Sequence, residues 1–189
     1  MNVAFKAMLF ARHIHKTQVR KYTGNPYADH LAEVAGIVAA SVGNMKHAVH
    51  AETMIAVAWL HDCVEDQNVE QDELVRQFGS DVANGVMLLS DMDVGNRASR
   101  KRASCTRLAS APGWVQTIKC ADLISNMASI ELHDPNFAVT FGYEKRELLN
   151  VMTLADPLLR QMAMGPVKPF PTSLIITKES DHGKAYYTA

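Results

Sequence analysis

The chain has few of the features that mark secreted and membrane proteins. Only three of its 189 residues are cysteine (Cys63, Cys105 and Cys120), and no two of them form a C-x-x-C pair. A disulfide framework is therefore not expected, and a reducing compartment fits this composition. No apolar run approaches the roughly 20 residues that a membrane span needs. We predict a soluble, cytoplasmic protein without membrane attachment.

An excess of charge of one sign is also missing. The formal net charge is −1 at pH 7, so no general attraction to DNA, RNA or acidic membranes is expected. Lys6 and Arg12 interrupt the apolar pattern near the N-terminus, which is not typical of a signal peptide. Hydrophobic residues make up 48% of the chain, so the sequence indicates a folded globular protein. From its low net charge we expect it to bind neither nucleic acid nor membrane.

Strand patterns are scarce, and helical periodicity dominates. We expect an all-α bundle in a single domain over residues 1–162, because a chain of this length can bury a sizeable core. Asn68 is expected to cap the fourth helix. A proline-containing tail follows over residues 163–189, with a strand-prone piece at 173–177. The expected helices cover residues 3–20, 29–42, 51–65, 68–78, 80–89, 97–109, 114–132 and 137–162.

Ionisable side chains gather at the end of the most apolar predicted helix, at His61, Asp62, Glu65 and Asp66. Buried carboxylates and imidazoles cost several kcal/mol each unless they are paired or metal-bound. In a continuous helix, His61 and Glu65 are one turn apart, as are Asp62 and Asp66, so all four share one edge. Such a group can hold a divalent cation and leave carboxylates free to handle a water molecule.

Other parts of the chain complete a motif set. His30 follows the turn at Pro26-Tyr27, and Asp122 lies in an apolar helix with Asn126 one turn later. With residues 18–30, 60–66, 78–79 and 119–126, the chain resembles the HD-domain phosphohydrolases. Within them it resembles the hydrolase domains of the RelA/SpoT type and their small single-domain alarmone-hydrolase relatives. Order and spacing match over about residues 4–160, and the resemblance implies an HD-domain helical bundle.

The resemblance implies four metal ligands, which are His30, His61, Asp62 and Asp122. This mixed nitrogen and oxygen set suits Mn²⁺, Fe²⁺ or Zn²⁺ better than Ca²⁺, and the family suggests Mn²⁺. The simpler alternatives are a turn histidine that caps a helix at His30 and a buried, paired acid at Asp122.

Glu65 and Asp66 resemble the pair that this family uses to position and deprotonate the attacking water. A carboxylate beside a metal site can accept that proton, because the metal lowers the pKa of the water. The alternative interpretation is a solvated helix end.

The resemblance also implies nucleotide contacts. Basic residues at a helix end or along a helix face are compatible with simpler roles, as a cap or a solvated surface. The tyrosine in the set lies near Phe141, which occupies the position where the family often has an aromatic contact. The residues expected to contact the nucleotide are Arg20, Lys21, Asn126, Ser129, Arg97, Arg100 and Tyr143.

The chain departs from the family pattern around the substrate. Leu31 stands where the family usually has proline, and Ala128-Ser129 replace a pair that usually contains arginine. Ser129 keeps a hydroxyl group, but Ala128 cannot replace an arginine. The expected metal ligands are all present, so the sequence supports hydrolysis more strongly than it supports one substrate.

Three hypotheses follow. The first is a guanosine-3′,5′-bis(diphosphate) 3′-pyrophosphohydrolase, which converts (p)ppGpp to GDP or GTP and pyrophosphate with metal-activated water. The second keeps the site and changes the nucleotide to NADPH, through its 2′-phosphate, or to an adenine alarmone. The third is an inactive nucleotide-sensing module on the same scaffold. A homo-oligomer is compatible with all three.

Overall fold

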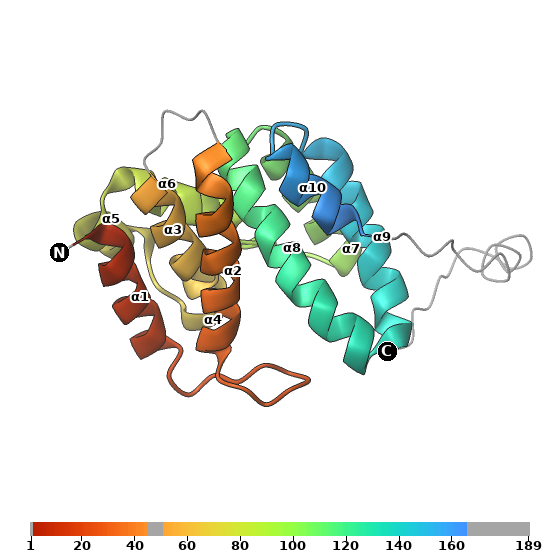
Figure 1. Cartoon of the computed structure of the whole chain (residues 1–189), viewed down its shortest axis with the longest axis horizontal. Helices are drawn as coiled ribbons and strands as arrows, with labels where there is room; N and C mark the ends of the chain where they lie inside the picture. Colours follow the sequence, from red (N-terminus) through yellow and green to blue (C-terminus); the bar gives the residue numbers. More distant parts are fainter. Residues whose placement is uncertain (1, 45–50, 166–189) are drawn as a thin grey trace, which may run out of the picture.

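The computed structural model describes residues 2–44 and 51–165. Within these residues the regular structure is helical, and β pairing is limited to an isolated bridge between Val19 and Pro26. The prediction of an all-α fold is confirmed (Figure 1). The elements are α1 (Val3–Ile14), α2 (Tyr27–Ser41), the 3₁₀ turn η1 (Val42–Asn44), α3 (Ala51–Leu60), α4 (Cys63–Gln67), α5 (Gln71–Phe78), α6 (Ser80–Leu89), α7 (Arg97–Ala109), α8 (Gly113–His133), α9 (Pro135–Val151) and α10 (Pro157–Met164).

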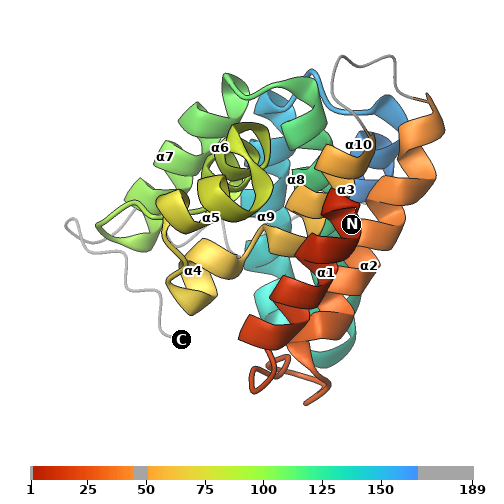
Figure 2. The same cartoon turned by 90° about the vertical axis from the view of Figure 1, so that its left-hand side faces the viewer.

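Two helices organise the packing. The very apolar α3 is surrounded by α1, α2 and α6, and the side chains from Ala56 to Leu60 are all buried. The long helix α8 contacts α2 on one side and α9 and α10 on the other, while α7 packs on α9. Figures 1 and 2 show α8 between the N-terminal helices and this C-terminal group. Side chains on α2 and α8 can therefore meet those at the end of α3.

The predicted single helix over residues 51–65 is wrong, because the chain breaks at His61-Asp62. Asp62 has φ −100° and ψ 0° and precedes α4. Asn68 does not cap the next helix as predicted. Instead it ends α4 in the left-handed conformation, with φ 54° and ψ 34°, which asparagine tolerates better than most residues.

The predicted helix over residues 137–162 is also wrong. The chain forms α9 and α10, which are separated by residues 152–156. The Asp156 carboxylate accepts a hydrogen bond from the Leu159 N–H over 2.9 Å, and Pro157 occupies the first turn of α10. An aspartate cap followed by proline is a favourable helix start. The first helix ends at Ile14, six residues earlier than predicted.

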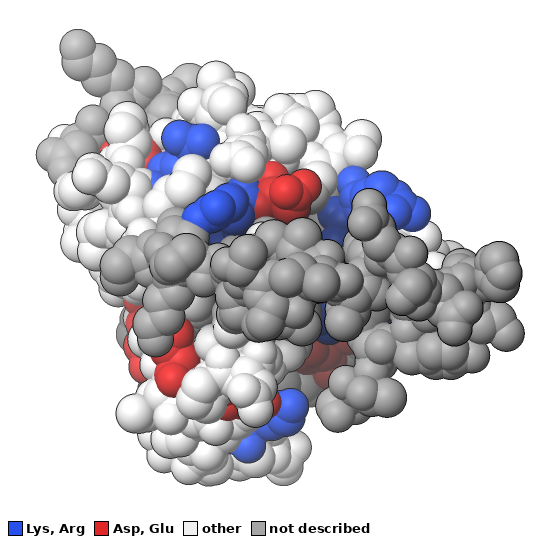
Figure 3. All heavy atoms as spheres, turned by 90° about the vertical axis from the view of Figure 1, so that its right-hand side faces the viewer, with Lys and Arg blue, Asp and Glu red and all other residues white. Residues whose placement is uncertain are grey.

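The predicted tail begins at residue 163, but α10 continues to Met164. The rest of the tail, including its strand-prone piece at 173–177, lies beyond Gly165 and thus outside the described residues. No helix among residues 2–44 and 51–165 is long and apolar enough to cross a membrane. On the face drawn in Figure 3, basic and acidic side chains occupy small separate groups.

Candidate active site

Four predicted ligands converge from three segments of the chain. His30 lies on α2, His61 and Asp62 lie at the break between α3 and α4, and Asp122 lies on α8. The His30 Nε2 atom is 3.4 Å from Asp122 Oδ1 and 3.6 Å from Asp62 Oδ2. The His61 Nε2 atom is 3.0 Å from Asp62 Oδ2 and 3.7 Å from Asp122 Oδ1. The ligand atoms of His30, His61 and Asp122 all lie within 4.8 Å of one another.

The Nε2 atoms of His30 and His61 face the place where the four predicted ligands converge. His61 uses Nδ1 to contact the Ala58 carbonyl over 2.8 Å, and His30 uses Nδ1 to contact Ser125 Oγ over 2.8 Å. Both Nε2 atoms are buried and have no hydrogen-bond partner. Buried polar atoms without partners are costly, and two imidazole nitrogens beside two carboxylates form a donor set suited to a divalent transition metal. The residues therefore fit a metal ion.

The carboxylates are held in their charged form. Burial alone would raise the pKa of Asp62, but His61 beside it holds that pKa well below its usual range. Burial would likewise raise the pKa of Asp122, and the Lys119 ammonium, 2.8 Å away, lowers it. The Tyr27 hydroxyl donates to Asp62 Oδ2 over 2.6 Å, and burial together with that carboxylate raises the pKa of the phenol.

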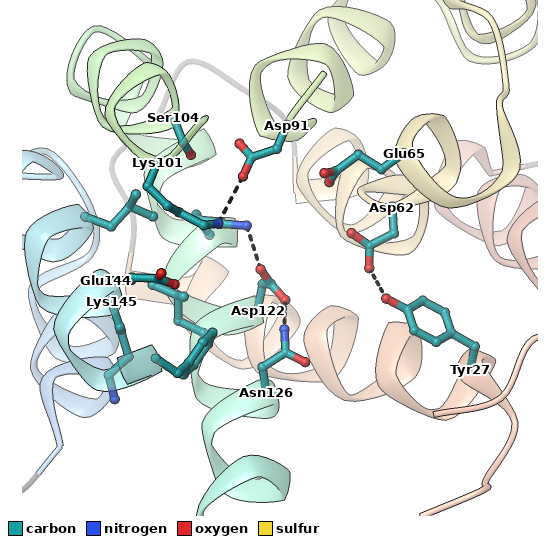
Figure 4. A pocket seen from close by; sticks show the side chains of 14 residues that line it. Tyr27, Asp62, Glu65, Asp91, Lys101, Ser104, Asp122, Asn126, Glu144 and Lys145 are labelled. Carbon is teal, nitrogen blue, oxygen red and sulfur yellow. Dashed lines mark hydrogen bonds and ion pairs between the residues drawn. The ribbon is translucent and has the colours of Figure 1, made fainter. Parts of the chain in front are cut away.

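A pocket of about 210 Å³ opens beside this cluster and faces α7 and α9. Asp62 and Asp122 lie on its inner side (Figure 4). Glu65 projects into it, and although the residue as a whole is exposed, partial burial of its carboxyl group raises the pKa of Glu65 to about 7. A group with that pKa can accept a proton near neutral pH. The outer wall includes Asp91, Lys101, Ser104, Phe141, Glu144 and Lys145.

Asp66, the second predicted catalytic carboxylate, is placed differently from Glu65. Its Oδ2 accepts a hydrogen bond from Gln18 Nε2 over 2.8 Å, and it is not part of the pocket wall. Gln18 in turn accepts from Gln67 over 2.6 Å and contacts His15 Nδ1 over 2.6 Å. These contacts tie the end of α4 to the segment after α1.

The predicted nucleotide contacts divide into two groups. Asn126 lines the pocket and donates to Asp122 Oδ1 over 2.6 Å. The Arg20 side chain is 11% exposed and pairs with Glu33 over 2.9 Å. Lys21 lies over the Tyr22 ring, with its Nζ 4.9 Å from the ring centroid.

Arg20 and Lys21 lie outside the pocket wall, and so does the second group, which comprises Ser129, Arg97, Arg100 and Tyr143. The Arg97 guanidinium forms two hydrogen bonds with Glu144, of 2.5 Å and 2.7 Å, and lies 5.4 Å from the centre of the Phe137 ring. Lys101, which lies on α7 with Arg97 and Arg100, lines the pocket and pairs with Asp91 over 3.3 Å.

Two contributors to the site were missed by the sequence reasoning. The sequence indicates only a turn at Tyr27, whereas in the structure its hydroxyl donates a hydrogen bond to Asp62. Ser125 was not considered, although it lies three residues after Asp122, which places both side chains on one face of α8. That spacing is the signal that identifies Ser125.

Comparison with known proteins relates this site to a family. Residues 7–141 match the family model of the HD domain. A probable chloroplastic GTP diphosphokinase, RSH2 of Oryza sativa subsp. japonica, is 33% identical over 174 residues, which cover 86% of this chain and 22% of that protein. The chain thus spans about a fifth of the length of the first curated relatives that it matches.

A shorter relative has a length closer to that of this chain. The guanosine-3′,5′-bis(diphosphate) 3′-pyrophosphohydrolase MESH1 of Drosophila melanogaster is 26% identical, over 69% of this chain and 70% of that protein. The structure of a metazoan ortholog of SpoT that hydrolyzes ppGpp matches with a TM-score of 0.76 and 21% identity, over 86% of this chain and 92% of that one. The extent of the family match settles the classification, and the chain belongs to the HD domain family.

Proposed function

We propose that the chain is a metal-dependent pyrophosphohydrolase that removes the 3′-pyrophosphate from (p)ppGpp and yields GDP or GTP. The observation that carries this proposal is the pair of buried, unpartnered Nε2 atoms on His30 and His61 beside two carboxylates and an open pocket. The names of the relatives support the alarmone as substrate, because MESH1 of Drosophila and a Synechocystis relative that is 30% identical are both named as guanosine-3′,5′-bis(diphosphate) 3′-pyrophosphohydrolases.

The proposed metal ligands are His30, His61, Asp62 and Asp122. Mn²⁺ is the proposed ion, since the mixed nitrogen and oxygen set accommodates it. A divalent cation bound there supplies Lewis acidity toward a phosphoryl oxygen and makes a nearby water more acidic.

The chain's own residues have separate roles in the proposed reaction. Glu65 accepts a proton from the attacking water, because its carboxyl group lies in the pocket and has a pKa of about 7. We propose that Asp66 shares this role. In this structure its carboxylate accepts a hydrogen bond from Gln18. The Lys119 ammonium, whose pKa is raised because neighbouring carboxylates outweigh its burial, stabilises charge on the phosphoryl oxygens.

The nucleotide is proposed to lie along the pocket wall and its rim. Asn126 lines the wall, while Arg20 and Lys21 lie on the loop before α2. Arg97 and Arg100 are proposed to face the pyrophosphate. The remaining proposed contacts are Ser129 and Tyr143. A cytoplasmic location is also proposed, in keeping with the scarcity of cysteine.

One observation favours a second nucleotide class. Phe137 and Phe141 pair on α9 with ring centroids 6.1 Å apart, and Arg97, the cation beside them, is already neutralised by Glu144. Of these two rings only Phe141 lines the pocket, and an aromatic ring there suits the stacking of a base better than it suits a second diphosphate. A phosphorylated dinucleotide such as NADPH is therefore the second candidate substrate.

The test is release of pyrophosphate from ppGpp with and without added Mn²⁺, comparing the native chain with Glu65→Gln and Asp66→Asn. We expect Mn²⁺-dependent formation of GDP and pyrophosphate, lost in Glu65→Gln. A metal-loaded native chain that releases nothing from ppGpp but releases phosphate from NADPH would replace the first substrate with the second. No hydrolysis of any nucleotide by the loaded chain would favour the sensing module.

A further inference from the structure

A chain of hydrogen bonds leads from His30 to the protein surface. His30 Nδ1 lies 2.8 Å from Ser125 Oγ, and that oxygen lies 2.5 Å from Glu33 Oε2. Arg20 donates to the same carboxylate oxygen over 2.9 Å and to the Ser125 carbonyl over 3.4 Å. We refer to these contacts as the His30–Ser125–Glu33 chain. It joins the loop before α2, α2 itself and α8.

The direction of each hydrogen bond follows from the number of protons available. An ionised carboxylate only accepts hydrogen bonds, and a serine hydroxyl has a single proton. The Ser125 hydroxyl therefore gives its proton to Glu33, and its oxygen can only accept from His30. It follows that Nδ1 of His30 carries a proton. In the neutral imidazole, Nε2 is then the unprotonated nitrogen, and it faces Asp62 and Asp122.

We propose that Ser125 and Glu33 are positioning residues that fix the proton of His30 on Nδ1 and so keep Nε2 ready to bind a cation. This inference rests on the proposed metal site. Ligand histidines commonly donate their second N–H to a carboxylate or carbonyl, which fixes the tautomer and the ring orientation. Here a serine is inserted between the imidazole and the carboxylate.

Arg20 gains a second role from the same geometry. Its two hydrogen bonds hold the Glu33 carboxylate and the Ser125 backbone together. Arg20 thus connects the proposed nucleotide-binding loop to a metal ligand. It acts on the cation through Glu33, not by direct contact.

His61 provides a natural comparison within the same protein. Its Nδ1 contacts the backbone carbonyl of Ala58 over 2.8 Å. That partner is present whatever the side chains are, so the tautomer of His61 does not depend on Ser125. A change at Ser125 is therefore expected to affect one of the two imidazoles only.

The experiment uses Ser125→Ala in the full chain, with two readouts. The first is the ¹⁵N NMR spectrum of the imidazoles in the metal-free protein, at a pH where they are neutral, with His30→Asn to assign the signals. We expect Nδ1 of His30 to be protonated in the native chain and its proton to move at least partly to Nε2 in Ser125→Ala, with His61 unchanged. The second is the Mn²⁺ dissociation constant, which we expect to rise about 10- to 100-fold.

Matched variants separate this role from a loss of packing. Ser41 is also buried, and its hydroxyl donates to the Val38 carbonyl over 2.8 Å at the far end of α2. Ser41→Ala should leave the Mn²⁺ affinity unchanged. Ser125→Thr keeps a hydroxyl group and should restore most of the affinity. Circular dichroism of each variant checks that the helices remain.

Glu33 variants test the outer link of the chain. The Glu33 side chain is 51% exposed, so water can replace part of its role, and Glu33→Ala should weaken Mn²⁺ binding less than Ser125→Ala. Glu33→Gln keeps an acceptor oxygen and should stay closer to the native chain than Glu33→Ala does.

The proposal is overturned if folded Ser125→Ala binds Mn²⁺ within about twofold of the native chain and His30 keeps its Nδ1 proton. Neither readout uses a nucleotide. Hydrolysis of ppGpp by the same samples therefore tests the proposed function separately, and a native chain that binds Mn²⁺ without hydrolysing ppGpp contradicts that function alone.

Discussion

The inner and outer walls of the pocket differ in how their polar groups are satisfied. Behind the inner wall, where Asp62 and Asp122 lie, the buried Nε2 atoms of the two imidazoles have no hydrogen-bond partner, and they lie 3.0–3.7 Å from these carboxylates. On the outer wall, Lys101 is paired with Asp91, and Glu144 is paired with Arg97, which lies just outside the wall. The inner wall is arranged to receive a cation, whereas the outer wall has already neutralised much of its own charge. The comparison teaches that the side chains of the proposed metal site are already in place, whereas the proposed nucleotide would have to compete with existing ion pairs.

Removal of an inner-wall ligand should have the largest effect. Asp122→Ala takes away a carboxylate that lies within 3.7 Å of both imidazoles. We expect roughly a 10⁴-fold loss of ppGpp hydrolysis, because the chemistry of the cation contributes several kcal/mol. The metal content after gel filtration should fall in parallel. Asp81→Ala, on the remote helix α6, is the control, and retention of activity by Asp122→Ala would remove Asp122 from the site.

Glu65→Gln should have the next largest effect, a loss of about 10²- to 10³-fold in kcat. The pKa of Glu65 is raised to about 7, so the carboxyl group is neutral below that pH and cannot accept a proton. In the native chain kcat should rise with pH, by about tenfold per unit below 7, and level off above it. The variant should lack this step. An unchanged pH profile in Glu65→Gln would assign the proton transfer to another group.

Removal of the metal should lower stability by an intermediate amount. A ligand present at 100 times its dissociation constant stabilises the folded state by about 2.7 kcal/mol. For a chain of this size, that corresponds to a fall in Tm of roughly 5–10 °C when a chelator is added. Mg²⁺ in place of Mn²⁺ should protect less well, since it prefers an all-oxygen site. A Tm that ignores both chelator and Mn²⁺ would mean that no cation is held.

The outer wall should give the smallest effects, and these should have opposite signs. Glu144→Gln frees Arg97 for an incoming phosphate and should lower KM, whereas Arg97→Ala should raise it. The side chains are 20% and 49% exposed, respectively, so we expect changes of about fivefold or less, as for other solvent-accessible ion pairs. If both variants raise KM, the ion pair itself shapes the pocket and does not compete with the substrate.

The helical fold and the family were predictable, and so was the convergence of the four proposed metal ligands, because they depend on local motifs in a fixed order. The break at His61-Asp62 was not, because the apolar periodicity of α3 runs on into α4 and nothing local forbids one long helix. Among the basic residues of α7, the sequence predicts nucleotide contacts from Arg97 and Arg100, but the basic residue of α7 that lines the pocket is Lys101. Which face of α7 meets α9 is decided by packing, and charge alone cannot show it. The assigned roles of these residues remain predictions.

The position of each ligand along the chain bears on the order of events during synthesis. His30, His61 and Asp62 all lie within the first third of the sequence, and Asp122 follows only on α8. Three of the four proposed ligands are therefore synthesised well before the last one. Because α8 also carries Ser125, which contacts His30, the proposed metal site can be complete only after this late helix packs against α2.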